Sequence, residues 1–336
     1  NAVNELRSKG TEITEEEEIA VKAAILLHDI GHGPYSHALE HVVVKGVHHE
    51  TLSLQIMHEM NAAFDGQLTL AIQIFTGAYH KPFLHQLISG QLDVDRMDYL
   101  SRDSFFCGVS EGVIGYDRIL KMLVVVDGQL MIEEKGIYSV EKFLVARRQM
   151  YWQVYLHKTV LSAEKMMVKI LERARSLYTS TDPAMQTQSA LDYFLGAFTG
   201  VMDSFALAQF CALDDHDIMH AIKRWSAHPD KVLSLLCSRF LTRKLYKTTI
   251  QSEPFLAATI AAKQKESVDA FELDPSEVDY VCFTGEATNT LYQTKDERIN
   301  ILFKDGSIKD ISLIDNALIH QNLSAAVKKN YICQLL

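Results

Sequence analysis

An apolar segment at residues 19–27 runs directly into His28-Asp29 and a glycine-containing break, and this junction constrains the fold more than any other feature of the chain. Thr14 and Glu17 have the spacing of a capping box, which predicts a helix start just before the segment. Since only one residue of the segment is charged, we expect a helix that is buried on all sides. Burying an imidazole and a carboxylate unpaired at its end is costly, so the fold must supply them with a partner.

The composition limits the classes of protein to consider. The chain has 336 residues, 48% of them hydrophobic, and its 33 Lys+Arg against 43 Asp+Glu give a formal charge of −10. This is typical of a globular protein of about two domains. Net acidity argues against specific or broad nucleic-acid binding, which needs clustered basic residues. No apolar run approaches the roughly 18 residues of a membrane span, so we expect a soluble protein without membrane association.

The cysteines and the first residue bear on the cellular setting. An odd number of cysteines, far apart and never spaced as CxxC, argues against a disulfide framework or a thiolate zinc site. We therefore expect a reducing, cytoplasmic location. Because the chain starts at Asn1 without Met, we also expect residues upstream of it. The cysteines are Cys107, Cys211, Cys237, Cys282 and Cys333.

The rest of the pattern predicts a mainly α-helical protein. Residues 92–105 and the long stretch 139–178, which lacks Pro and Gly, are expected to be helical, as is 191–246. Residues 122–133 are expected to form a β-hairpin that turns at Asp127-Gly128.

The C-terminal part is expected to be a smaller α+β region. Strands are expected at 280–283, 298–303 and 308–313, the last two joined by a turn at 304–307. We place soft domain boundaries near residues 180 and 250. The resulting regions are a core at 1–180, a helical extension at 181–250 and the α+β region at 251–336.

Three histidines gather around the break after the apolar segment. His28 and His32 are one helical turn apart if the helix continues, and His37 follows closely. Imidazoles collected in this way need a common partner, and a metal ion would provide one. A hydrogen-bonded helix end is the alternative interpretation.

A second segment, residues 93–103, supplies more carboxylates. At helical spacing Asp95, Tyr99 and Asp103 share one stripe, while Leu92 and Met97 can face the core. A solvated charged face would give the same pattern, but the aromatic residue within the stripe favours a lined pocket.

A third segment repeats every four residues. Arg147, Tyr151 and Tyr155 face one direction, with a cation at one end and two aromatic rings above it. That layout fits a nucleotide, because guanidinium binds phosphate bidentately and tyrosine packs on sugar or base. The alternative is an aromatic core face whose arginine extends to solvent.

Taken together, the His-Asp pair, its GHGPYSHALEH continuation, His49-Glu50 and the DVDRMDYLSRD segment resemble the HD-domain phosphohydrolases, most closely the deoxynucleoside triphosphate triphosphohydrolase branch. The resemblance covers roughly residues 15–180 and implies a helical HD core. It implies a metal held by His28, Asp29 and Asp95, with the fourth ligand, a histidine, expected upstream of this chain.

The resemblance also implies roles for the other candidates. His49, His32 and Glu40 would be catalytic, with His49 near the scissile bond and Glu40 where the family often has Asp. Substrate binding is implied for six side chains, of which Tyr151 stands where a relative has His. They are His37 near the phosphates, Arg147 on a terminal phosphate, Tyr99 and Asp103 at the deoxyribose, and Tyr151 and Tyr155.

Two imidazoles and two carboxylates suit one divalent ion per site, namely iron, manganese, nickel, zinc or, less well, Mg²⁺. Such an ion polarises a phosphoryl oxygen and lowers the pKa of bound water from about 16 toward about 7. The leading hypothesis is hydrolysis of a dNTP to deoxynucleoside and triphosphate. Alternatives are an HD phosphohydrolase acting on a monophosphate, cyclic nucleotide or alarmone, and a non-catalytic nucleotide-sensing assembly protein. The family further implies a homo-oligomer and an allosteric nucleotide.

Overall fold

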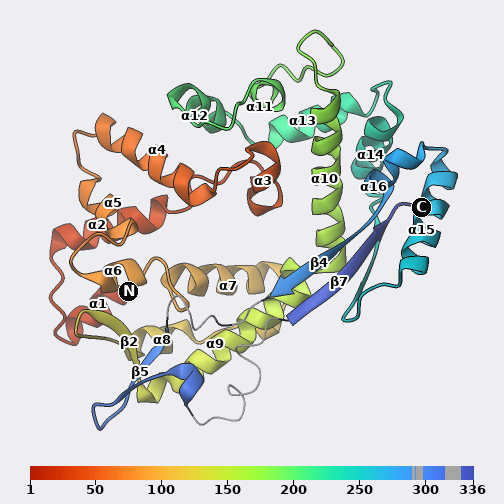
Figure 1. The fold of residues 1–336 in the computed structure, drawn as a ribbon. Coiled ribbons are helices and arrows are strands. Elements are labelled where there is room, and N and C mark those ends of the chain that lie inside the picture. Colours follow the sequence, from red (N-terminus) through yellow and green to blue (C-terminus); the bar gives the residue numbers. More distant parts are fainter. Residues whose placement is uncertain (290–291, 293–297, 315–326) are drawn as a thin grey trace. The chain divides into compact units, whose positions relative to one another are not determined.

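The computed structural model describes residues 1–289, 292, 298–314 and 327–336. The chain forms two compact units (Figure 1). Unit 1 comprises Asn1–His28, Met57–Tyr155 and Thr288–Val327, and unit 2 comprises Asp29–Ile56, Leu156–Ala287 and Lys328–Leu336. Each unit is discontinuous in sequence, so this division differs in kind from the boundaries near residues 180 and 250, which stay a prediction.

Unit 1 is built mainly from helices, as the sequence predicts. Its fully buried side chains include Leu100, Ile119, Phe143 and Leu144, which come from three different helices. Helices α7 (Val94–Cys107) and α9 (Ile137–Met150) contact each other (Figure 1). The helices are α1 (Ala2–Ser8), α2 (Glu15–Leu27), the second half of α4 (His49–Ala63), α5 (Thr69–Phe75), α6 (Pro82–Gln86), α7 (Val94–Cys107), α8 (Tyr116–Met122) and α9 (Ile137–Met150).

A small sheet in unit 1 has the strand order β1-β2-β5-β6. The predicted hairpin is confirmed: β1 (Leu123–Val126) and β2 (Gln129–Glu133) are antiparallel and turn at Asp127-Gly128, both of which have positive φ. Strand β5 (Asn300–Leu302) is parallel to β2, and β6 (Ile308–Asp310) returns antiparallel to β5.

Unit 2 has a larger helical core with its own sheet, ordered β3-β7-β4. Trp225 is fully buried in this core and donates a hydrogen bond to the Met185 carbonyl. The elements are α3 (Glu40–Val43), the first half of α4, α10 (Lys158–Leu177), α11 (Leu191–Gly196), α12 (Ser204–Cys211), α13 (Asp215–Trp225), α14 (Lys231–Leu241), β3 (Lys247–Gln251), α15 (Ala257–Phe271), α16 (Val278–Val281), β4 (Cys282–Asn289) and β7 (Val327–Gln334).

The expectation that α2 is buried on all sides was wrong. Its start is as predicted, since Thr14 and Glu17 form a complete capping box. However, Ile19 is 68% exposed and Leu26 78% exposed. Only one face of the helix packs, partly against α5. An apolar sequence permits burial on every side, but burial also requires neighbours on every side.

The long helical stretch is divided. Helix α9 ends at Met150, a π-helical turn covers Tyr151–Tyr155, and α10 starts at Lys158. His157 is extended, and its side chain accepts a hydrogen bond from the Thr159 amide, which caps α10. The boundary between the two helices therefore forms without the Pro or Gly that would have indicated it in the sequence.

The strand predictions are partly shifted. Val278–Val281 is helical, so β4 begins only at Cys282. The last two predicted strands pair as β5 and β6, and residues 311–313 form a 3₁₀ turn instead of extending β6. Within the described part of the chain, no helix has the length and apolar character needed to cross a membrane.

Candidate active site

A histidine and a carboxylate meet in unit 1 where α2 ends and α7 begins. The His28 Nδ1 is 2.7 Å from the Ile25 carbonyl oxygen, to which its proton is donated in the matching tautomer. In that tautomer Nε2 carries the lone pair, and the Oδ1 of Asp95 lies 3.7 Å from it. A ligating imidazole commonly has its other nitrogen bonded in this way, because the bond fixes the ring and raises its basicity.

The start of α7 positions Asp95. Asp93 is the N-cap and accepts hydrogen bonds from the Arg96 amide at 2.7 Å and the Gly90 amide at 3.0 Å. It also forms an ion pair with the Arg96 guanidinium. Burial raises the pKa of Asp93, against the opposing effect of Arg96. These contacts fix the first turn of the helix, where Asp95 lies, and the sequence patterns had not singled Asp93 out.

Asp29 is joined to His28 by a peptide bond and is the first residue of unit 2. There its Oδ1 lies 3.8 Å from the His32 Nε2. Imidazole nitrogen and carboxylate oxygen form a borderline-hard donor set, which fits a divalent transition metal. The residues present are therefore compatible with the metal that the resemblance implies.

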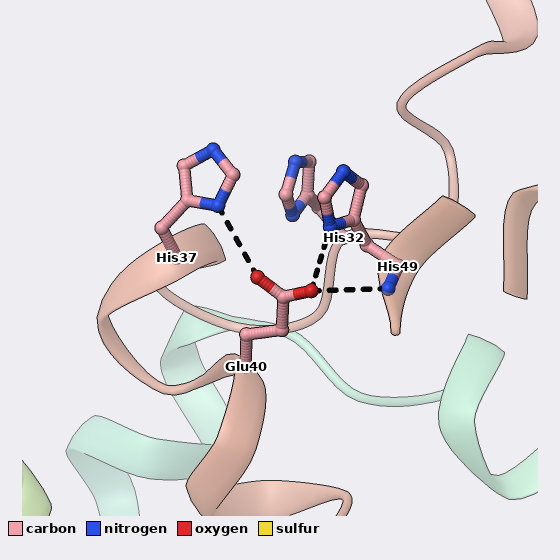
Figure 2. A group of neighbouring side chains, drawn as sticks. All are labelled: His32, His37, Glu40 and His49. Atoms are coloured by element: carbon pink, nitrogen blue, oxygen red, sulfur yellow. Dashed lines mark hydrogen bonds and ion pairs between the residues drawn. The ribbon is translucent and has the colours of Figure 1, made fainter. Parts of the chain in front are cut away.

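Three histidines surround one carboxylate in unit 2, as Figure 2 shows. Oε1 of Glu40 lies 2.6 Å from His49 Nδ1 and accepts the His49 backbone N–H at 3.1 Å. The other oxygen is 3.2 Å from His37 Nδ1. His32 stacks on His49, with ring centroids 4.0 Å apart. The longer glutamate side chain thus reaches both histidines.

These contacts determine the charge of Glu40. Burial alone would raise its pKa, but hydrogen bonds from His49 and His37 lower the pKa to about 2. Burial and the neighbouring histidines lower the pKa of His32. Near neutral pH the cluster thus combines an ionised carboxylate with an imidazole that favours its neutral form, an arrangement suited to orienting a histidine that transfers a proton.

We expect the Glu40 contacts to weaken in acid. Because the folded pKa of about 2 is below the ordinary value of 4.5, the carboxylate stabilises the fold above pH 4.5, and this stabilisation is lost as the pH falls toward 2. After allowance for solvent screening, the effect is about 1–2 kcal/mol. Urea unfolding at pH 7, 4.5 and 3.5 should show the wild type converging on Glu40→Gln, and parallel profiles would contradict this assignment.

The loop that carries the histidines is tightly held at its start. Gly31 donates its N–H to the Oγ of buried Ser53 at 2.9 Å, and a Cβ at Gly31 would collide with the His49 carbonyl oxygen. Glycine is therefore required by close backbone approach. Further along, Tyr35 and Ser36 have φ of 56° and 47°, a left-handed conformation that costs roughly 1–2 kcal/mol per non-glycine residue.

A cation and three tyrosines form the second group of unit 1. The guanidinium carbon of Arg147 is 5.9 Å from the Tyr151 ring centroid, and Tyr151 contacts Tyr155 edge-on at 5.3 Å. Tyr99 lies 6.3 Å from Tyr155, whose hydroxyl donates to Asp103 at 2.6 Å. These contacts join Arg147, Tyr151 and Tyr155, which the sequence places on one helix face, and bring Tyr99 and Asp103 to Tyr155, while the roles of these residues stay predictions.

Charge and burial make this group suited to binding an anion. Nη1 of Arg147 is buried and, among the described residues, has no hydrogen-bond partner. Burial raises the pKa of Tyr99 to about 12, despite the opposing charge of Arg147, and burial with the Asp103 hydrogen bond raises that of Tyr155 further. Both phenols therefore stay protonated, beside a guanidinium with unused donors.

The structure thus groups the candidate residues within each unit. His28 and Asp95 are together in unit 1, where the residues around Arg147 also lie. Asp29 and the histidine cluster belong to unit 2. Ser53 and Asp93 were missed by sequence reasoning; for Asp93 the available signal was an aspartate at an N-cap position.

Comparison with known proteins agrees with the motifs. Residues 4–103 match the HD domain family model, and residues 114–188 match the HD associated region. A solved phosphohydrolase from Bacteroides thetaiotaomicron is 46% identical, with a TM-score of 0.89 over 99% of this chain and 83% of that one.

Two relatives show how far the similarity extends. Protein YwfO of Bacillus subtilis, uncharacterised, is 31% identical over 86% of this chain and 67% of its own length. The Dictyostelium discoideum protein named deoxynucleoside triphosphate triphosphohydrolase SAMHD1 homolog is 31% identical over 51% of this chain, which spans 36% of that relative. With its motifs, helical fold and family matches, the chain belongs to the HD-domain phosphohydrolase superfamily.

Proposed function

We propose that the chain is the catalytic core of a metal-dependent dNTP triphosphohydrolase. The main support for a nucleotide substrate is the Nη1 of Arg147, which is buried within the tyrosine group and has no hydrogen-bond partner among the described residues. A buried guanidinium without an anion is costly, and a nucleotide phosphate would remove that cost through charge-assisted hydrogen bonds. Similarity to the Dictyostelium relative supports the same substrate class.

The reaction would be attack by a water oxygen on the α-phosphorus. The bond from that phosphorus to the 5′ oxygen breaks, which releases deoxynucleoside and triphosphate once the 5′ oxygen gains a proton. His49, oriented by Glu40, would provide or position that proton, and His32 would act with it. His37, on the other oxygen of Glu40, would contact the phosphates.

His28, Asp29 and Asp95 would hold one divalent ion, whose identity among iron, manganese, nickel, zinc and Mg²⁺ the donor set does not determine. When bound, the ion would supply Lewis acidity and an activated water at neutral pH. Arg147 would neutralise the phosphate tail. These assignments rest on the family resemblance and are supported by the donor type of each side chain.

The tyrosines would recognise the nucleoside. Tyr155 commits its hydroxyl proton to Asp103, which leaves its ring and that of Tyr99 as the surfaces available to the sugar. Tyr151, which contacts both the Arg147 guanidinium and the Tyr155 ring, would contact the substrate beside the phosphates. A ring packed beneath C2′ would disfavour a ribose hydroxyl.

Product analysis tests the proposal. The metal-loaded protein would be incubated with each dNTP, alone and with a second nucleotide as activator, and deoxynucleoside and triphosphate would be quantified. Orthophosphate or a linear monophosphate from other nucleotides would instead indicate a different HD phosphohydrolase. Failure to release nucleoside from any dNTP would count against the proposal. We also propose homo-oligomerisation, an allosteric nucleotide and a cytoplasmic location, which sedimentation, nucleotide titration and fractionation would test.

A further inference from the structure

The turn before His37 has a backbone conformation that its own residues do not favour. The Ser36 N–H donates to the Gly33 carbonyl at 3.0 Å, with Pro34 and Tyr35 between them. Tyr35 therefore occupies the third turn position with φ of 56°, where glycine or asparagine is usual, and Ser36 follows with φ of 47°. Two consecutive left-handed non-glycine residues need support from outside the turn.

A carboxylate 180 positions later in the chain supplies a contact to this turn. Oδ1 of Asp215 accepts the Tyr35 N–H at 2.8 Å, and both residues belong to unit 2. Asp215 is in the first turn of α13, but the capping of that helix is performed by Asp214 and Asp217. Its carboxylate is thus available to hold the backbone of Tyr35.

The turn is connected to the histidine cluster by the residues that follow it in the chain. His37 follows Ser36 directly, and its Nδ1 is 3.2 Å from Glu40, which also bonds His49. A change in the left-handed pair would rotate the backbone that carries His37. The contact between His37 and Glu40 would then be lost or lengthened.

We infer that Asp215 is a positioning residue that holds the left-handed Tyr35-Ser36 backbone and thereby places His37 against Glu40. The carboxylate acts through the Tyr35 N–H and does not touch the reacting groups. The kinetic consequence rests on the proposed function, whereas the hydrogen bond can be measured without it.

The test uses three variants of the whole chain. Asp215→Ala removes the acceptor, and Asp215→Asn keeps an acceptor oxygen without the charge. Asp217→Ala is the matched control, because it removes a charge from the same turn of α13 but has no hydrogen bond to Tyr35. Hydrogen–deuterium exchange of peptides covering residues 33–38 and dNTP kinetics are measured for each variant.

We expect Asp215→Ala to speed exchange at this turn by about tenfold and to lower kcat several-fold with little change in KM. Asp215→Asn should restore both, and Asp217→Ala should lower thermal stability while leaving both at wild-type values. Unchanged exchange in Asp215→Ala, or equal effects of Asp217→Ala, overturns the inference. If no dNTP is hydrolysed but exchange responds as expected, the proposed function fails and the role of Asp215 in the turn stands.

Discussion

Replacing Arg147 with methionine should abolish most activity while making the protein more stable. Its Nη1 is buried without a partner among the described residues, so the substituted apolar side chain removes a cost and should raise the free energy of unfolding by about 1 kcal/mol. The same change removes the proposed phosphate contact and should lower kcat/KM by roughly 10²–10³-fold. Triphosphate release and urea unfolding measure the two effects.

A variant that loses activity while its free energy of unfolding rises identifies a binding residue, whereas loss of a packing residue lowers the free energy of unfolding. Arg148→Met, which makes the same charge change at the next position of α9, serves as the control and should leave activity unchanged. A less stable, fully active Arg147→Met protein would show that the guanidinium is part of the aromatic packing, as the alternative interpretation of this helix holds.

Asp95→Asn should remove the metal. An amide is a weaker ligand than a carboxylate, and its neighbour His28 Nε2, 3.7 Å away, would be left without that anionic partner. We expect substoichiometric metal by elemental analysis and, for a loss of about 4 kcal/mol of Lewis-acid stabilisation, roughly 10³-fold lower kcat.

A control for this prediction lies one turn along the same helix. Asp98 is exposed and paired with Arg102, so Asp98→Asn makes the same chemical change without touching His28. It should retain full metal content and activity. Wild-type metal content in Asp95→Asn would exclude Asp95 as a ligand.

Local signals predicted the parts of the fold that short-range chemistry decides. The capping box at Thr14 and the turn at Asp127-Gly128 are as expected, since each depends on residues within a few positions. Leu92 and Met97 are buried as the helical stripe predicts. The HD motif likewise identified the candidate metal ligands, whose roles stay predictions.

Long-range packing explains what the sequence could not predict. Exposure of Ile19 depends on which neighbours α2 has, and the end of α9 carries no Pro or Gly to signal it. The Asp215 contact with Tyr35 joins positions 180 apart, and no spacing rule links them. The sequence could not show that Glu40, which is longer than the aspartate common in the family, contacts His49, because that contact depends on the loop conformation.

The parallel pairing of β2 with β5 has a consequence for synthesis of the protein. Ile132 pairs with Ile301, so a nascent chain exposes the outer edge of β2 until the ribosome has added almost 170 further residues. An unpaired strand edge with apolar side chains is a site for aggregation. Slowed translation or truncation before residue 300 should therefore yield insoluble intermediates, and these would be the forms most dependent on chaperones.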